Sequence, residues 1–350
     1  MKKAARVAAV IMVALFLALA PGFLAPMVSV DRWAQWLGRS VPAYQGAIKV
    51  WHVAGWKAGH GAFSTWLSQI SRGFERRNFG VYIEIEGMTE DEAAARLQSG
   101  ETADVYSFPT GFFKDAAKLA PIEDPGLRPE HKKSGEYGGL YALPYALGGY
   151  MLFINEDVLY EKGIDVNDET AADLAISASN AGWGGDAVAM YMAARQAGHY
   201  TAMGFEATGA YIGPHSMIFE LLDADNPPMY SLYPLGAYTD MAQYVAVADG
   251  LEEGKREVCS DFAYYLLRPS VQKGLNDLGV IPVMAEGDGE LEELAHLMSG
   301  GIVIPNCFTW DIRAKEEAAA LAVRALAGDE EAAARLKSYM GAVVNGKEVL

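Results

Sequence analysis

Hydrophobic and polar positions alternate in short segments along the first third of the chain. Residues 47–53 and 81–87 alternate with the period of two that half-buried strands show, and residues 102–108 form a third strand-like run. The pattern therefore predicts three strands in this part of the chain.

Helical patterns follow each of these runs. Residues 62–77 place large apolar side chains on one helical face. Residues 89–100 begin with Thr89 and Glu92, which have the spacing of a capping box, and residues 111–120 read as a third helix. This β-α-β-α-β-α order predicts an α/β fold, a sheet with helices on its faces. Further helices are predicted near the carboxyl end, at residues 255–279 with a break near Pro269, at 312–327 and at 329–340.

Glycines and prolines mark three places where the chain could cross between two domains. Residues 139–165 consist of two strand-like halves around Gly148 and Gly149. Residues 226–235 contain three prolines, and residues 279–284 combine glycine, proline and apolar residues. These segments predict two domains joined by several crossings.

The amino-terminal residues have the pattern of an export signal. Lys2, Lys3 and Arg6 precede an uncharged apolar run, residues 7–30. The run is long enough to span a bilayer, so it is either a cleaved signal peptide or a retained anchor. Both alternatives place the rest of the chain outside the cytoplasmic membrane.

Composition narrows the classes of partner. The chain has 350 residues, 51% of them hydrophobic, and a formal net charge of −17. This length is sufficient for two domains, and the negative charge disfavours binding to nucleic acid or anionic lipid. Cys259 and Cys307 are the two cysteines. Export permits a disulfide between them, but we favour two buried thiols.

A glycine-rich loop after the first predicted strand carries unusual side chains. Residues 55–61 contain Trp56, Lys57 and His60. Ligands of open α/β sheets bind outside the carboxyl ends of the strands, which is where this loop lies. His52 and His60 are spaced across a loop, so we expect surface or hydrogen-bonded histidines there and no metal site. The sequence has no recognisable nucleophile elbow, zinc-protease motif, phosphate loop or dinucleotide fingerprint, so we expect neither an enzyme nor a cofactor.

Several segments, in this order, resemble the family 1 extracellular solute-binding proteins of ABC importers, the group that includes maltose-binding protein. They are IKVWH with its following helix, SGETADVYSFPTG, GGLYALPYALGGYMLFINEDVLYEKGID, YLLRPSVQKGLNDLGVIPV and TWDIRAKEEAAALAVRALAGDEEAAARL. Together they cover most of residues 47–340. The chain departs from maltose-type relatives at Gly148, which aligns with a carboxylate in the first crossing, and this argues against malto-oligosaccharides as the ligand.

The resemblance implies a two-lobed periplasmic-binding-protein-like fold of the class II type. The implied division is a signal or anchor at 1–30, a lead-in at 31–46, a first lobe from 47–145 and 234–283, and a second lobe from 146–233 and 284–350. Ligand would be held between the lobes. The positions that the resemblance places at the ligand are Trp56, Lys57, Phe108, Thr110, Tyr145, Tyr150, Trp183, Tyr211 and Trp310.

The implied function is delivery of a solute to the transmembrane subunits of an ABC permease by ligand-induced closure of the lobes. The aromatic positions suit a sugar, because flat rings cover the apolar face of a pyranose while polar groups such as Lys57, Thr110 or Asp186 meet its hydroxyls. We expect a monomer. A non-sugar solute such as a polyamine or metal, an exported glycosidase, and a binding protein associated with a membrane sensor remain the alternatives.

Overall fold

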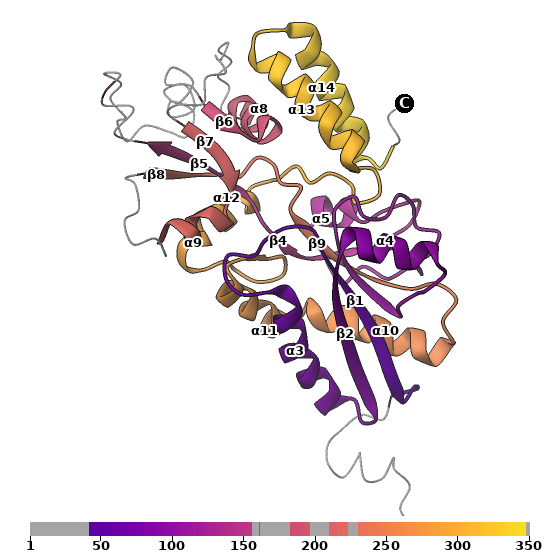
Figure 1. Ribbon diagram of the computed structural model, residues 1–350. Coiled ribbons are helices and arrows are strands. Elements are labelled where there is room, and N and C mark those ends of the chain that lie inside the picture. Colours follow the sequence, from indigo (N-terminus) through magenta and orange to yellow (C-terminus); the bar gives the residue numbers. More distant parts are fainter. Residues whose placement is uncertain (1–41, 156–160, 162–182, 197–209, 223–229, 348–350) are drawn as a thin grey trace, which may run out of the picture.

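The computed structural model of the protein describes residues 42–155, 161, 183–196, 210–222 and 230–347, and the strands in these ranges form two separate sheets (Figure 1). The expected export segment at 1–30 and most of the expected lead-in lie outside the described residues. Within the described ranges, every helix is too short or too polar to cross a bilayer.

The first sheet has six strands in the order β10-β4-β9-β3-β1-β2. β1 lies between β2 and β3 and is parallel to both, whereas β9 is antiparallel to β3 and β4. The parallel strands are the three that the alternating pattern predicted. Their bounds, with those of the other members, are β1 Gly46–Ala54, β2 Val81–Thr89, β3 Val105–Pro109, β4 Leu143–Leu147, β9 Ala242–Val247 and β10 Ile281–Pro282.

The second sheet has four strands in the order β6-β7-β5-β8. β5 is antiparallel to β7 and β8, and β6 is parallel to β7. The bounds are β5 Tyr150–Asn155, β6 Trp183–Gly185, β7 Ala210–Pro214 and β8 Tyr230–Leu235.

Helices cover both sheets. α3 packs against β2 and α10 against β9, while α13 packs against α14 and α8 beside the second sheet (Figure 1). Thr89 and Glu92 form the predicted capping box at the start of α4. The bounds are α3 Phe63–Arg77, α4 Glu90–Gln98, α5 Pro129–Ser134, α8 Ala187–Gln196, α9 Ser216–Leu222, α10 Glu253–Leu266, α11 Pro269–Gln272, α12 Glu292–Ser299, α13 Ile312–Leu326 and α14 Glu330–Val344, with short 3-10 turns at Lys273–Leu278 and Gly289–Leu291.

The chain passes between the two sheets near each predicted crossing. The first passage is at Gly148 and Gly149, between β4 and β5, as predicted. The second lies at residues 236–241, after the predicted segment, whose last residues form β8. The third follows β10, after which α12 packs against β8. We refer below to the six-stranded sheet with its helices as the first lobe, and to the four-stranded sheet with α8, α13 and α14 as the second lobe.

Residues 291–308 differ from the sequence expectation for 284–350. Leu291, Leu294, Met298 and Phe308 belong to the hydrophobic cluster of the first lobe, whereas Trp310 and α13 belong to that of the second. The cause is the position of α12 at the crossings, where the side chain of Leu294 packs directly over Gly149.

The predicted helix at 111–120 is wrong, because the structure has turns there. Gly111 has a φ of +87°, which a helix cannot accommodate, and its N–H donates to the carbonyl of Cys307 at 2.9 Å. Phe113 packs its ring against Phe108 with centroids 4.8 Å apart. Tertiary packing therefore outweighs the helical pattern.

The cysteines are two buried free thiols, as favoured. Burial raises the pKa of the Cys259 thiol to about 12 and that of Cys307 further. Both are therefore protonated and unreactive at neutral pH.

Candidate functional site

The carboxyl ends of the three parallel strands of the first lobe meet at one place. A Cβ at Gly55, which follows β1, would lie 2.3 Å from the side chain of Pro109 at the end of β3 and 3.0 Å from a carboxylate oxygen of Glu90, which follows β2. Gly55 therefore allows the three strand ends to approach closely. This edge is where ligands of open α/β sheets bind.

Trp56 projects from this edge to the junction of the lobes. Its half-buried ring packs against the hydrophobic clusters of both lobes. Its ring centroid lies 5.0 Å from that of Phe63 and 6.0 Å from that of His215, which precedes α9. The indole Nε1 is buried and has no hydrogen-bond partner within the described part of the chain. A buried donor without an acceptor is costly, so this atom is suited to an incoming oxygen.

A buried carboxylate, Asp240, organises the polar groups on the other side of the junction. Tyr150 donates its hydroxyl to Oδ1 of Asp240 at 2.7 Å, and the indole N–H of Trp310 donates to Oδ2 at 3.0 Å. The ammonium of Lys315 lies 2.7 Å from the same Oδ2. Tyr150 also lies 3.1 Å from Oδ2 of Asp186. We call these five residues, Tyr150, Asp186, Asp240, Trp310 and Lys315, the Asp240 cluster.

The two carboxyl groups of the cluster have opposite pKa shifts. Burial raises the pKa of Asp240, but the charge of Lys315 and the hydrogen bonds from Lys315, Trp310 and Tyr150 outweigh burial and hold this pKa below its ordinary value. Burial raises the pKa of Asp186, and the negative charge of Asp240 raises it further, against a hydrogen bond from the Ala189 N–H. The Tyr150 hydroxyl has one proton for two carboxyl groups, so a proton on Asp186 would complete the second hydrogen bond.

Residues of the first lobe face this cluster. Burial raises the pKa of Glu90, with Asp91 adding to the effect and the charge of Lys315 opposing it. Gly111 lies so close to the backbone of Trp310 that a Cβ would meet its carbonyl oxygen at 2.1 Å. The Asp240 cluster is thus at the same junction as the loop that carries Trp56.

Gly148 is explained by the same junction. A Cβ there would lie 2.8 Å from the His215 ring and 3.0 Å from Cβ of Met241. The Gly148 carbonyl accepts a hydrogen bond from the Thr239 hydroxyl at 2.9 Å. A side chain at position 148 has no room, and the second crossing supplies a carboxylate, Asp240, directly after Thr239.

The lobes also touch through α9. Lys57 forms an ion pair with Glu220 at 2.6 Å, and both side chains are exposed. The Phe219 ring packs on Gly59 and Gly279, with the His60 ring at a centroid distance of 4.3 Å. These contacts hold the loop at 55–61 against the second lobe.

His215 connects the crossings beneath these contacts. The Gly149 N–H donates to its Nδ1 at 3.2 Å, so its Nε2 carries the proton and donates to the carbonyl of Gly279 at 2.9 Å. The side chain is completely buried, and burial lowers its pKa to about 4. A neutral imidazole therefore joins the first and third crossings to the start of α9.

The structure brings four of the predicted site residues to this junction. Trp56, Tyr150 and Trp310 lie there as described, and Thr110 follows β3 and bonds through its N–H to the carbonyl of Ala242, at 3.2 Å. Tyr150 and Trp310 are buried and reach Asp240 with their polar atoms only. Their rings do not offer an open stacking face in this conformation.

Phe108 and Tyr145 differ from the expectation of ligand-facing rings. Both are completely buried. Phe108 stacks on Tyr244 in the core, and the Tyr145 hydroxyl lies 2.9 Å from that of Ser107 while its ring stacks on Trp66. Their strands lie inside a sheet that is covered on both faces, so neither ring reaches solvent.

The remaining predicted positions lie apart from the Asp240 cluster. Lys57 is exposed and engaged with Glu220. Tyr211 is exposed on β7, where it pairs with Phe153 of β5. Trp183 begins β6, but its side chain lies outside the described residues. No hydrogen bond among the described residues links Lys57 or Tyr211 to Asp240.

Sequence reasoning missed Asp240, Lys315 and Glu90. The signals were weak: Asp240 follows the second crossing, Glu90 follows β2, and Lys315 stands one helical turn after the cap of α13. Among the described residues, no group of three or more His, Cys, Asp or Glu side chains is arranged to hold a metal ion. His52 is buried and bonds through Nδ1 to Ser107, whereas His60 is exposed, so the two do not form a pair.

Comparison with known proteins places the fold. No family model matches the sequence, and no curated protein matches it. Solved structures do match: the cyclic α-maltosyl-1,6-maltose binding protein of Arthrobacter globiformis has 14% identity and a TM-score of 0.58, covering 86% of this chain and 100% of that chain. A family 1 extracellular solute-binding protein from Bifidobacterium longum subsp. infantis has 14% identity and a TM-score of 0.58, covering 85% and 99%.

The sugar-binding protein MalE from Xanthomonas citri is also similar, with 13% identity and a TM-score of 0.55, covering 86% of this chain and 97% of that chain. At such low identities the likeness concerns the fold. The chain has the two-lobed α/β fold of the family 1 extracellular solute-binding proteins, and the Asp240 cluster and Trp56 lie where its lobes meet.

Proposed function

We propose that the protein binds a sugar or oligosaccharide between its lobes and delivers it to the transmembrane subunits of an ABC permease. The observation that carries this proposal is the buried, unpartnered indole N–H of Trp56 at the junction that also holds the Asp240 cluster. An indole donor on one side and carboxylate acceptors on the other match hydroxyl groups, which both donate and accept. Similar structures whose titles name sugars as ligands support the same class of solute.

The mechanism we propose is opening and closing about the three crossings. Separation of α9 from the loop at 55–61 would expose Trp56 and the Asp240 cluster. A solute that contacts both walls would then shift the population toward the closed form. The permease would accept the closed form, and no chemistry on the solute is required. The proposal includes an exported monomer, with residues 1–30 as its signal or anchor.

Isothermal titration calorimetry against mono- and oligosaccharides tests the proposal. We expect a micromolar dissociation constant for at least one sugar, which corresponds to about −8 kcal/mol. Binding should weaken by at least about tenfold, or about 1.4 kcal/mol, in Asp186→Asn or Trp56→Ala. Heat from a non-sugar solute and none from any sugar would reject the carbohydrate class.

A cationic solute is a second candidate, because the structure brings Asp186, Asp240 and Glu90 to one junction with Lys315 as their nearby cation. A polyamine needs several carboxylates, and the sequence gave no reason to expect them together. Spermidine in the same calorimetric panel distinguishes the two solute classes. Turnover of a chromogenic glycoside would instead favour a glycosidase, and a neighbouring sensor-kinase gene would favour a sensor partner.

A further inference from the structure

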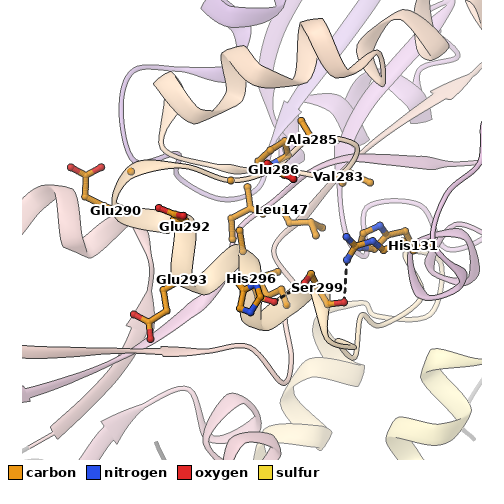
Figure 2. Close-up of a pocket in the computed structure, with 17 residues that line it drawn as sticks. His131, Leu147, Val283, Ala285, Glu286, Glu290, Glu292, Glu293, His296 and Ser299 are labelled. Atoms are coloured by element: carbon orange, nitrogen blue, oxygen red, sulfur yellow. Dashed lines mark hydrogen bonds between the residues drawn. The ribbon is translucent and has the colours of Figure 1, made fainter. Parts of the chain in front are cut away.

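A pocket of about 680 Å³ lies beside the crossings and shares no residue with the Asp240 cluster. Its walls come from α5, from Leu147 at the end of β4, from β10 and from α12 (Figure 2). Sites for small molecules have volumes of roughly 300–1,000 Å³. The pocket is therefore large enough for a ligand of its own.

The pocket has an apolar floor. Leu147, Ile281, Val283 and Met298 line it and are buried. β10 pairs with β4 directly opposite Leu147, so the strand pair fixes the position of these side chains. Such a floor suits the hydrocarbon part of a ligand.

His131 is a buried polar group in this pocket. It lies on α5, is 4% exposed and lines the pocket, yet its Nδ1 has no hydrogen-bond partner among the described residues. Burial lowers its pKa to about 4, so the imidazole is neutral at physiological pH. Buried polar atoms in native proteins are nearly always hydrogen-bonded, so a ligand atom is a natural partner for this nitrogen.

The rim of the pocket is acidic. Glu286, Glu290, Glu292 and Glu293 line it, and within the described part of the chain none of the four forms an ion pair. Arg128 is the one lysine or arginine in the lining, and its guanidinium donates to the carbonyl of Ser299 at 3.3 Å. Figure 2 shows Glu290, Glu292 and Glu293 on one side of the pocket and His131 on the other, with Leu147 between them. The charge at the rim favours a cation.

We propose that this pocket is a second ligand site, for a small organic cation with an apolar body and a hydrogen-bonding group at its other end. The ammonium would lie at the glutamates, the hydrocarbon over Leu147 and Val283, and the hydrogen-bonding group at His131 Nδ1. The proposal is independent of the solute held at the Asp240 cluster.

Three probes with the same six-carbon body test the charge preference: 6-amino-1-hexanol, 1,6-hexanediol and 6-hydroxyhexanoate. In calorimetric titrations of the whole protein, we expect the amine to bind with a dissociation constant below about 10 mM, at least fivefold tighter than the diol, and the anion not to bind. Equal binding of all three, or no binding of the amine, would overturn the proposal.

Variants locate the binding. His131→Phe should weaken amine binding by about 2–10-fold, the effect of one net hydrogen bond. Glu290→Gln with Glu292→Gln should weaken it by about 2–5-fold, because exposed charges contribute little individually. The matched pair Glu316→Gln with Glu331→Gln, exposed on α13 and α14, should leave it unchanged. Melting temperatures of all variants show whether each one folds.

The Asp186→Asn variant separates the two sites. Amine binding that survives in Asp186→Asn and falls in the glutamine pair supports the pocket. Amine binding that is lost in Asp186→Asn and kept in the glutamine pair would assign the amine to the Asp240 cluster and reject the second site. The glutamine pair is exposed, so this comparison holds even if His131→Phe does not fold.

Discussion

The ammonium of Lys315 lies 2.7 Å from the carboxylate of Asp240, whose side chain is 4% exposed. Lys315 stands on α13, and Asp240 lies in the second crossing between the sheets. The pair therefore ties the last part of the chain to the junction of the lobes. Because Asp240 is buried, its charge depends on Lys315 and on the donors from Tyr150 and Trp310.

Removal of the ammonium should leave a buried charge without its counter-ion. We expect Lys315→Met to lower the free energy of unfolding by about 2–3 kcal/mol, less than for a fully buried pair because Lys315 is partly exposed. Asp240→Asn added to Lys315→Met should recover part of this loss. Urea denaturation measures both, with Lys337→Met on α14 as the exposed control. Equal effects of the two lysine substitutions would contradict the role given to Lys315.

Trp56→Phe should separate stability from binding. The substitution keeps an aromatic ring and removes an N–H that has no partner, so the free protein should lose little stability from the N–H itself. The affinity for a sugar should fall by about 5–10-fold through loss of one hydrogen bond. Trp66→Phe is the matched control, because the Trp66 Nε1 is also buried and unpartnered but packs on Tyr145 in the first lobe. Unchanged sugar affinity in Trp56→Phe would remove Trp56 from the binding site.

Acid should destabilise the protein through its buried histidines. Burial lowers the pKa values of His52, His131 and His215 to about 4 from an ordinary value of 6.5. Between these pH values the unfolded chain binds more protons, so the stability present above about pH 6.5 is lost as the pH falls toward 4, by up to about 1.4 kcal/mol per pH unit for each histidine. Other groups add their own contributions, so the comparison between variants is decisive.

The His215→Gln variant should have a shallower dependence of stability on pH in this window, because one of the three histidines is absent. His296→Gln, at an exposed position, should keep the dependence of the unmodified protein. Denaturant unfolding at half-unit pH steps measures the slopes. The same slope in His215→Gln and the unmodified protein would mean that His215 is not held neutral by the fold.

The ion pair between Lys57 and Glu220 should act as a weak, salt-sensitive contact between the lobes. Both side chains are exposed, so the pair contributes about 0.2–1 kcal/mol. Lys57→Glu should weaken solute affinity by a few-fold at low salt, and the exchange Lys57→Glu with Glu220→Lys should restore it. Calorimetry at low and high ionic strength measures the effect, which salt should reduce. A loss of affinity that the exchange does not restore would assign Lys57 a direct contact with the solute.

The sequence predicted the strands of the first lobe because those segments have a clear periodicity and turn signals. β1, β2 and the capping box of α4 appear where the pattern placed them. The segment at 111–120 failed because Gly111 and Phe113 obey contacts with Cys307 and Phe108, which a local pattern does not contain.

The site was less predictable than the fold. Every residue of β3 is buried, so the pattern could not reveal which face of Phe108 the core covers. Tyr145 was placed beside a crossing correctly, but its ring points into the first lobe and stacks on Trp66. Asp240 and Lys315 are 75 positions apart in numbering, and only the approach of the second crossing to α13 brings them together.

The packing of Phe219 on Gly59 and Gly279 has a calorimetric consequence. The Phe219 ring is 3% exposed, and separation of α9 from the two glycines would hydrate it together with the apolar surface that it covers. Hydration of apolar surface raises the heat capacity. Solute binding that closes the lobes should therefore have a negative heat-capacity change, and its enthalpy should become more favourable as the temperature rises. Phe219→Ala should reduce the magnitude of that change.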